Sequence, residues 1–566
     1  MSPTGPSPPR AAPPRGADRS ARHAVVVVGA GPVGLSLAID LAQRGQRVVL
    51  LDRNPSPASD ADRALVLARQ SSRAICFAKR TLEIFDRLGV GNAMVEHGVR
   101  WQRGKVFFGN APVYTFDLLP EDGHERPAFV NLPQSFVEAR LVERACELPL
   151  IDLRWGHRVS AVERQPGGVR IEVDTPEGIR ALQTDWLVAC DGSRSAVRAA
   201  IGEEASGRVF RDRFLIVDVK MRAGDVFPGG VAERWFWFDP PFHRGQSVLL
   251  HRQPDDIWRI DFQLGWDADP EAEKAPERIA ARVRALLRHG LGRDVDFSLV
   301  WASVYTFACQ RMARFRHQRI VFAGDAAHGV SPFGARGANS GVQDADNLGW
   351  KLAAVLRGQA PESLIDSYCV EREAAADENI LHSTRSTDFI TPKSEVSRLF
   401  RDAVLDLARE HDFARRLVNS GRLSTPTVLR DSPLNTPDVD AFEGAMHPGA
   451  PTADAPLQMG RQGEHEGQGD EGGHDGPGVR ASWLLREAAP GFTLLFAGEA
   501  PAWAATLRLE VLALPRTADA QGWLARRYDL RPGNAYLLRP DQHVCARWRL
   551  PTAAGVRAAL ERAQGR

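Results

Sequence analysis

Glycines and a carboxylate that could bind a nucleotide follow the first apolar run of the sequence. Residues 24–28 are almost entirely valine, as in a strand buried on both faces of a parallel sheet, and the turn Gly29-Ala-Gly31-Pro-Val-Gly34 follows directly. A second apolar run ends at Asp52. Glycines at this spacing let a pyrophosphate approach the backbone, and the acid accepts hydrogen bonds from ribose hydroxyls. The motif therefore predicts dinucleotide binding and leaves both NAD and FAD open.

Two later turns favour FAD. The buried run 186–190 leads into Asp191-Gly192, and another short apolar run leads into Gly324-Asp325. An NAD dehydrogenase needs no further strand-end turns of this kind. FAD is longer and is held at its adenosine ribose, its pyrophosphate, its ribityl chain and its ring. Three glycine and aspartate turns at the ends of buried strands therefore predict an FAD site.

Composition excludes several other classes. The 566 residues carry 72 Lys+Arg and 71 Asp+Glu, and a net charge of +1 provides no electrostatic attraction to nucleic acid or to an anionic membrane. Six scattered cysteines without a CxxC predict neither a disulfide framework nor a metal site. No apolar stretch is long enough to span a membrane, and the proline-rich start lacks the apolar core of a secretory signal. We expect a soluble, cytoplasmic protein.

The helices and strands that must position these residues are predicted from the periodicity of apolar residues along the sequence. Helical spacing after Gly34 completes a βαβ unit, and a long helix is expected at about 338–356. Between about 205 and 305 most segments alternate with period two, with one helix near 276–289, which predicts a mainly antiparallel sheet. Residues 459–478 are rich in glycine and have no apolar period.

On these motifs, taken in order, the sequence resembles the single-component FAD-dependent aromatic hydroxylases, the 4-hydroxybenzoate hydroxylase-like group. The likeness covers about residues 24–400 and is closest to the 3-(3-hydroxyphenyl)propionate and phenol hydroxylase branch. Besides the three turns, it rests on Arg73-Ala and Arg80-Thr-Leu-Glu. Many members of that branch also carry a thioredoxin-like C-terminal domain without redox cysteines. The tail here has a suitable length and holds only Cys545.

The resemblance implies an α/β fold: a Rossmann-like FAD-binding domain, an inserted mainly antiparallel β-sheet substrate domain and a small thioredoxin-like C-terminal domain. The expected segments are a disordered leader at 1–23, the first part of the FAD-binding domain at 24–204 with substrate-domain strands near 101–130, the substrate domain at 205–305, the second part of the FAD-binding domain at 306–400, a helical or extended connection at 401–458, a flexible linker at 459–478 and the C-terminal domain at 479–566.

The resemblance also implies cofactor contacts. Asp325 is expected at the ribityl or pyrophosphate part of FAD, and the start of the 338 helix at the flavin ring, where a helix N-terminus stabilises the negative charge of reduced flavin. The full expected set is Gly29, Gly31, Gly34, Asp52, Arg53, Arg73, Gln134, Asp191, Gly192, Gly324, Asp325, Pro332, Gly337, Ala338 and Asn339. His328, beside the third turn, is expected to be a hydrogen-bonded structural residue.

Several residues of the predicted antiparallel sheet could contact the substrate. Trp235 and Trp237 share one face of a predicted strand, where they could floor an aromatic pocket, although core packing is favoured. His251 and Tyr305 could also meet substrate. No residue is identified as the base that removes a phenolic proton; a water chain, His251 and Tyr305 all stay open.

The predicted activity is that of an NAD(P)H-dependent FAD monooxygenase, which hydroxylates a phenolic or other electron-rich ring through a flavin C4a-hydroperoxide. Its partners would be a small aromatic substrate, O₂ and NADH or NADPH, with a homodimer left open. One alternative is a flavin-dependent halogenase, because Trp235-Phe-Trp237-Phe-Asp239-Pro240 is close to the halogenase tryptophan motif. Another is a flavin-free sensor or scaffold.

Overall fold

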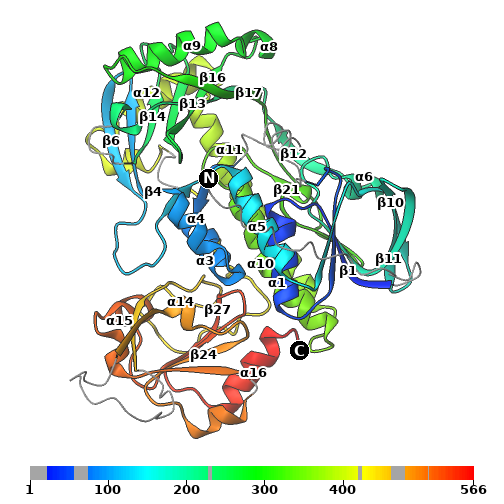
Figure 1. Ribbon diagram of the computed structural model, residues 1–566. Helices are drawn as coiled ribbons and strands as arrows, with labels where there is room; N and C mark the ends of the chain where they lie inside the picture. Colours follow the sequence, from blue (N-terminus) through cyan, green and yellow to red (C-terminus); the bar gives the residue numbers. More distant parts are fainter. Residues whose placement is uncertain (1–21, 57–73, 227–231, 419–422, 461–478, 508) are drawn as a thin grey trace, which may run out of the picture.

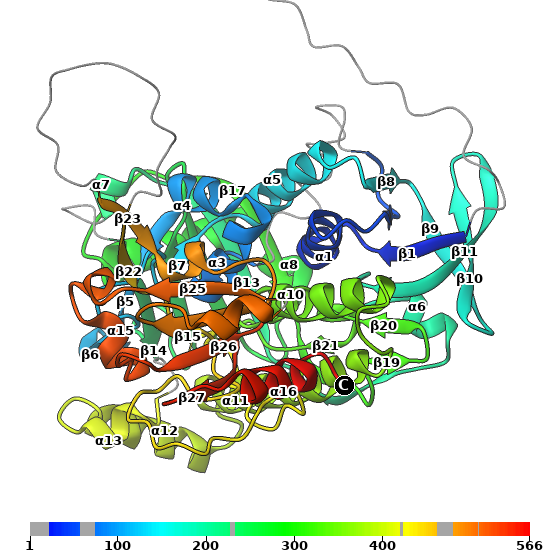
Figure 2. The same ribbon diagram turned by 90° about the horizontal axis from the view of Figure 1, so that it is seen from below.

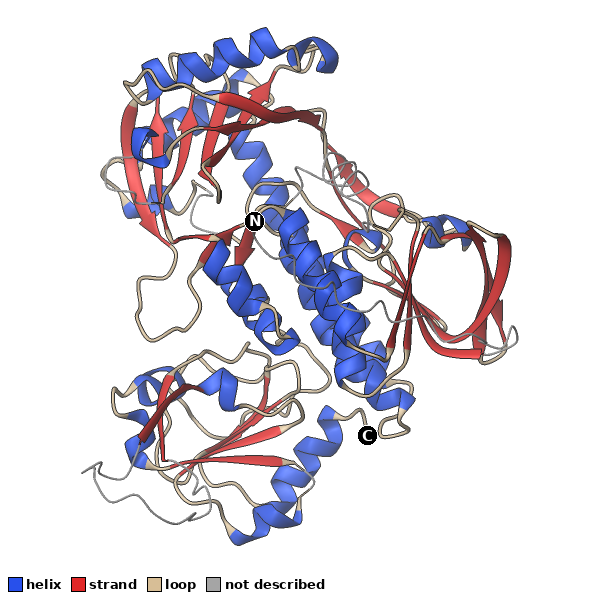
Figure 3. Ribbon diagram, viewed as in Figure 1, coloured by secondary structure: helices blue, strands red, loops and turns tan. Residues whose placement is uncertain are grey.

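The computed structural model describes residues 22–56, 74–226, 232–418, 423–460, 479–507 and 509–566 (Figure 1). The expected leader, most of the expected linker and Arg73 lie outside the described residues. The chain folds into a central unit built on a largely parallel sheet, a second unit built on an antiparallel sheet, and a third unit formed by the C-terminal part (Figures 1 and 3).

The central sheet has the strand order β19-β20-β11-β1-β2-β8, extended by β10 and β9. Its strands are β1 (Arg22–Val28), β2 (Val48–Asp52), β8 (Ile151–Trp155), β9 (Arg158–Gln165), β10 (Gly168–Thr175), β11 (Gly178–Ala189), β19 (Arg316–His317) and β20 (Ile320–Phe322). Strand β1 pairs parallel with β2 and β11, and β11 pairs parallel with β20. The carboxyl ends of β1, β11 and β20 therefore meet at one edge of the sheet.

Helices cover this sheet. They are α1 (Pro32–Gln43), α3 (Lys79–Leu88), α4 (Gly91–His97), α5 (Gln134–Glu147), α6 (Ala196–Ala200), α10 (Gly337–Leu356) and α11 (Leu364–Ile390). Helices α1 and α10 run side by side (Figures 1 and 2). Both are buried along most of their length because other elements enclose them.

The second unit is a seven-stranded sheet in the order β17-β13-β16-β15-β14-β5-β6. Its strands are β5 (Arg103–Phe108), β6 (Ala111–Asp117), β13 (Arg213–Lys220), β14 (Arg234–Phe238), β15 (Ser247–Arg252), β16 (Ile257–Leu264) and β17 (Ser298–Tyr305). Only the β14–β5 pair is parallel. Residues of α9 (Pro276–Ala285) and the π-helical turn Leu286–Gly290 pack on one face; we call this seven-stranded sheet the substrate sheet.

Smaller elements join the two units. A three-stranded sheet is formed by β3 (Cys76–Ala78), β7 (Phe129–Asn131) and β4 (Val99–Trp101), and another by β12 (Ala205–Val209), β18 (Ala308–Met312) and β21 (His328–Gly329). Short helices α7 (Ala223–Val226) and α8 (Pro270–Glu273) flank the substrate sheet, and α12 (Glu395–Leu407) and α13 (Asp412–Arg415) follow α11.

The C-terminal unit contains β24 (Thr493–Ala497), β25 (Glu510–Leu514), β26 (Ala535–Leu538), β27 (Val544–Trp548) and α16 (Ala553–Ala563), with short helices α14 (Leu484–Glu487) and α15 (Trp523–Tyr528). The order β25-β24-β26-β27, with only β24 and β25 parallel, is that of a thioredoxin-like core.

This unit takes in more of the chain than the expected 479–566. Strand β22 (Pro456–Gly460) pairs with β23 (Val479–Trp483), and Leu457 is buried in the same core as Leu495 and Tyr536. Because the pairing partners flank the glycine-rich segment, the domain begins before that segment.

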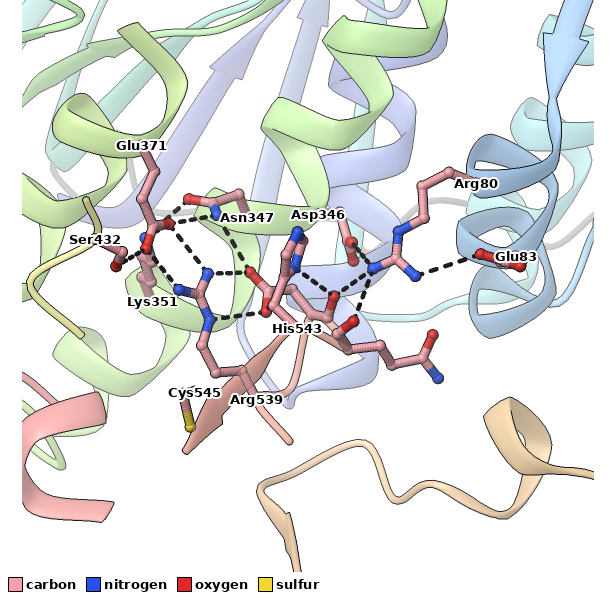
Figure 4. A network of polar contacts seen from close by, with 12 residues as sticks. Arg80, Glu83, Asp346, Asn347, Lys351, Glu371, Ser432, Arg539, His543 and Cys545 are labelled. Carbon is pink, nitrogen blue, oxygen red and sulfur yellow. Dashed lines mark hydrogen bonds and ion pairs between the residues drawn. The ribbon is translucent and has the colours of Figure 1, made fainter. Parts of the chain in front are cut away.

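A buried ion network joins the C-terminal unit to the helices of the central unit (Figure 4). The Arg539 guanidinium donates to the Glu371 carboxylate on α11, and its Nε donates to Asp541 at 3.0 Å. Lys351 on α10 donates to Glu371 at 2.6 Å. All four charged side chains are 0% exposed, two positive and two negative. Asn347 donates to both carboxylates.

The charges of this network depend on one another. Burial would raise the pKa of Glu371, but Arg539 and Lys351 hold that pKa well below its usual range. Burial lowers the pKa of Lys351 to about 8, although Glu371 opposes the shift. Removing one carboxylate would therefore leave buried positive charge without compensation.

We expect Glu371→Gln to lower the free energy of unfolding by about 3–5 kcal/mol, because it removes one partner of a buried ion network. Thermal unfolding and limited proteolysis should both show earlier opening. Glu378→Gln, on the same helix but with a 45% exposed side chain, is the matched control and should have little effect. Equal unfolding temperatures for the two variants would contradict this account.

Candidate active site

The crevice at the ends of β1, β11 and β20 is lined by backbone in close contact. Gly29 has φ +104°, and a Cβ there would lie 2.4 Å from the carbonyl oxygen of Cys190. A Cβ on Gly34 would lie 1.9 Å from the Gly29 oxygen. Glycine is therefore required at both positions, since any side chain would separate the first turn from β11 or from α1.

The start of α1 is shaped for an anion. A Cβ placed on Gly31 would meet no atom within 4 Å, and no side chain caps the helix. An uncapped helix N-terminus with open space beside Gly31 suits a pyrophosphate at the positive end of the helix dipole. Asp52 accepts from the Ala30 N–H at 2.7 Å and the Asn54 N–H at 2.8 Å, and its carboxylate has acceptor capacity left for a ribose.

Asp191 carries a buried oxygen without a partner. Its Oδ2 accepts from the Val197 N–H at 3.2 Å, whereas Oδ1 is buried and has no hydrogen-bond partner within the described residues. Burial raises the pKa of Asp191. The next residue, Gly192, has φ +83°. An unsatisfied buried acceptor beside the glycine turn is the feature expected where a ligand hydroxyl completes the hydrogen bonding.

The turn at Gly324-Asp325 packs against the glycine turn that begins at Gly29 and leads into α1. Gly324 has φ +61°, and its Cβ would lie 2.8 Å from Val33 of α1. The Gly324 N–H donates to Asp344 at 2.9 Å, and Asp325 lies exposed at the crevice. The residues of the three turns, distant in sequence, thus share one crevice, and its glycine cradle, free helix N–H groups and orphaned acceptor fit FAD.

His328 is structural. It is buried, and its Nε2 lies 2.7 Å from Asp344, which also accepts from Arg372 at 2.6 Å. Burial raises the pKa of Asp344, but His328 and Arg372 outweigh it and keep that pKa low. The hydrogen-bonded role expected from the sequence agrees with this geometry.

The start of α10 lies beside the same crevice. No side chain caps the helix, and Gly337 and Ala338 are partly exposed, while Pro332 in the preceding loop is exposed. The Asn339 side chain is buried and fully used within the protein: Oδ1 accepts from the Ala78 N–H, and Nδ2 donates to the Cys76 carbonyl. Its side chain therefore joins α10 to β3, and only its backbone is available to a cofactor.

The remaining expected cofactor contacts are Gln134, Arg53 and Arg73. Gln134 begins α5, accepts from the Ala74 N–H at 3.1 Å and donates to Glu138 at 2.7 Å, so its amide already has protein partners. Arg53 is exposed next to Asp52. Arg73 lies outside the described residues.

The aromatic residues of β14 divide between two faces. Trp237 is 1% exposed and Trp235 is partly buried, and both pack with the cluster under α9. Core packing, which the sequence analysis favoured for Trp235 and Trp237, agrees with these positions. Nothing in the positions supports a substrate contact. Tyr305 is 42% exposed at the outer strand β17 and lies outside the cavity described next.

A small cavity, about 30 Å³ in volume, lies on the opposite face of β14. Its walls include five phenylalanines and one arginine: Phe116, Phe236, Phe238, Phe333, Phe389 and Arg234. Phe333 belongs to the loop that leads into α10, so this cavity adjoins the crevice for the cofactor. A mainly apolar cavity with few polar groups, here Arg234 and Ser386, is typical of a small-molecule site.

Charged groups lie on the same face of the substrate sheet. His251 is buried, with Nδ1 4.0 Å from Cys76 Sγ, and burial together with Arg234 and Arg259 sets its pKa well below the usual value. Arg259 forms a two-point ion pair with Asp218 at 2.8 Å. These groups, from β13 to β16 and β3, surround the Asp261 carboxyl.

Asp261 has a buried Oδ1 with no hydrogen-bond partner in the part of the chain described. Burial raises the pKa of Asp261 to about 6, against the charges of Arg259 and Arg234. Sequence reasoning missed both Asp261 and Arg234. The available signal is strand parity: Arg234, Phe236 and Phe238 alternate with Trp235 and Trp237, and only the two tryptophans were named as possible substrate contacts, with core packing favoured for them.

A family model described as an FAD binding domain matches residues 22–383. The chain belongs to this family. It is 31% identical over 385 residues to the 3-(3-hydroxy-phenyl)propionate/3-hydroxycinnamic acid hydroxylase of Mycolicibacterium smegmatis, covering 67% of this chain and 64% of that enzyme. It is 31% identical over 557 residues to the 6-methylpretetramide 4-monooxygenase of Streptomyces rimosus, covering 92% and 90%.

Solved structures agree on the fold. The flavin-dependent monooxygenase PieE, solved with FAD and substrate, has a TM-score of 0.75 and 22% identity over 96% of this chain and 98% of that chain. The anhydrotetracycline hydroxylase of Streptomyces rimosus has a TM-score of 0.67 and 26% identity over 96% and 99%. The protein is therefore an FAD-dependent monooxygenase that acts on aromatic substrates, as expected, and the α/β fold is confirmed.

Two further observations concern the described residues alone. None of their helices is long and apolar enough to cross a membrane. No group of three or more His, Cys, Asp or Glu side chains among them could hold a metal ion.

We expect Asp325→Ala to yield protein that has lost most of its FAD, because this carboxylate lies at the turn where three strand ends meet. The ratio of flavin absorbance to protein absorbance after purification measures the loss. Asp366→Ala, an exposed aspartate on α11, should keep full occupancy. Full occupancy in Asp325→Ala, with an unchanged fold, would rule out the assigned contact.

Proposed function

We propose that this monooxygenase uses NADH or NADPH and O₂ to hydroxylate a phenolic ring bound in the phenylalanine-lined cavity. The observation that carries the proposal is the position of this cavity. It lies between the substrate sheet and the loop that leads into α10, next to the crevice that fits FAD. The relatives' names, which specify hydroxylation of phenolic compounds, support the same substrate class.

FAD, held at the three strand-end turns, would supply the redox chemistry of hydride acceptance and oxygen activation. The protein's own residues prepare the site. The phenylalanines exclude water from the ring and orient it, and the uncapped N-terminus of α10 stabilises negative charge at its end. Within the described residues we find no second dinucleotide fold, so the proposed reductant would dock transiently.

Asp261, which lies on the same sheet face as the cavity but outside its walls, is the proposed acceptor of the phenolic proton. The proton moves from the substrate hydroxyl to the carboxylate, and the electron pair stays on the phenolate oxygen, which makes the ring a better nucleophile. At neutral pH a carboxyl with a pKa of about 6 is mostly ionised and can accept this proton. The neutral His251 beside it is held in place by its burial.

A panel of phenols tests the proposed activity. NADH or NADPH oxidation should accelerate when a suitable phenol is added, and mass spectrometry should find the product heavier by one oxygen atom. The panel should include single-ring phenols such as 3-(3-hydroxyphenyl)propionate and fused-ring phenols such as 1,8-dihydroxyanthraquinone. Absence of any response with either reductant, or a halide-dependent product, would overturn the proposal.

The pH dependence tests Asp261. In the wild type, kcat/KM for an active phenol should rise as pH increases through about 6, because the base works only when deprotonated. Asp261→Asn should lose this rise and turn over about 10²- to 10⁴-fold more slowly. Asp267→Asn, an exposed aspartate just after β16, is the control. An unchanged acid limb in Asp261→Asn would exclude the role.

A further inference from the structure

We propose that Arg234 is an anion-binding residue of the substrate cavity and that it selects aromatic substrates carrying a negatively charged group. This inference rests on the proposed function and narrows its substrate class. The shared chemistry is a ring-borne anion, either a carboxylate on a side chain or a phenolate oxygen. The guanidinium would pair with it in a fork geometry.

The first argument is the place of Arg234. It is the first residue of β14 and lines the cavity together with Phe236 and Phe238 from the same strand face. The side chain is only partly buried, as is typical of a group that faces a cavity. Its Nε is buried and has no hydrogen-bond partner in the described ranges.

The second argument is the contrast with its neighbour. Arg259 lies two strands away on the same face, and its guanidinium donates two 2.8 Å hydrogen bonds to the Asp218 carboxylate. Because this pair is buried, the two donors that face Asp218 cannot bind a ligand anion. Nothing of this kind holds Arg234: no ion pair of its guanidinium is found within the described residues. One arginine of this face therefore supports the sheet, and the other remains available to a ligand.

The third argument is the local charge. Burial lowers the pKa of Arg234, so its positive form is destabilised where it stands. The nearest titratable groups on this face are His251, which is neutral, the thiol of Cys76, whose pKa is raised to about 12 by burial, and Asp261. Asp261 lies across from Leu249, and its charge is shared between Arg234 and Arg259, so it offsets only part of the burial of Arg234. Because the nearby negative charge only partly offsets the burial of the Arg234 guanidinium, a bound anion would stabilise its positive charge.

The cavity walls complete the argument. Phenylalanine rings on several sides make contact with a flat ring favourable, and the other polar side chain of the walls, the Ser386 hydroxyl, donates to the His382 carbonyl at 2.8 Å and carries no charge. In such surroundings a charge-assisted hydrogen bond decides between two ligands of the same shape.

The test measures binding to the oxidised FAD-loaded protein at pH 8, without turnover, from the change in flavin absorbance. Two matched pairs of probes separate the two anion sources. 3-(3-Hydroxyphenyl)propionate is compared with its amide for the carboxylate, and 4-nitrophenol is compared with 4-nitroanisole for the phenolate. The variants are Arg234→Met, Arg234→Lys and, as the control, Lys105→Met. Lys105 lies on the adjacent strand β5 but over Trp235 on the opposite face.

We expect the wild type to bind the charged member of at least one pair about 10- to 100-fold more tightly than its neutral partner. Arg234→Met should abolish that preference while binding the neutral probe unchanged, Arg234→Lys should keep part of it, and Lys105→Met should keep all of it. No preference in the wild type, binding of no probe, or a preference that survives in Arg234→Met would overturn the proposal. Hydroxylation of a neutral phenol by a wild type without this preference would show that only this inference, and not the proposed function, has failed.

Discussion

The close approach of three backbone turns is the constraint on which the rest of the structure depends. Gly29 lies against Cys190, Gly34 against Gly29, and Gly324 against Val33, each closer than any side chain would allow. These contacts bring β1, β11 and β20 into register with α1 at one edge of the sheet. Because the strands are parallel, their carboxyl ends and the N-terminus of α1 then face the same crevice, and a long cofactor can contact all of them at once.

The parts of this crevice that could be predicted are local in sequence. A valine-rich strand, a glycine turn and a terminal acid are read within about 30 residues, because each residue type meets a local requirement of backbone geometry or hydrogen bonding. The same holds for α10, whose start was expected at Ala338 and lies at Gly337. The role of Asn339 could not be read locally, since its amide is satisfied by β3 and α3, more than 250 residues earlier.

The substrate sheet shows a different limit. Strand β14 is aromatic on both faces, so alternation shows that it is a strand but not which face meets the cavity. That choice depends on α9, which covers Trp237, and on Phe333 and Phe389, which come from distant segments. Arg234 was overlooked for the same reason: at the start of a strand, a charged residue is typical of a solvated end. Only the tertiary structure places it against the cavity.

Helix α10 links the cofactor crevice to the C-terminal unit. Its first turn adjoins the crevice, whereas Asn347 and Lys351 further along enter the buried network with Glu371, Arg539 and Asp541. Most residues of the helix are buried, and none is exposed. The thioredoxin-like unit has only Cys545, which is buried with a pKa raised to about 12, and so it lacks a reactive thiol. Through the buried network, this unit packs against the later turns of the helix whose uncapped N-terminus adjoins the crevice.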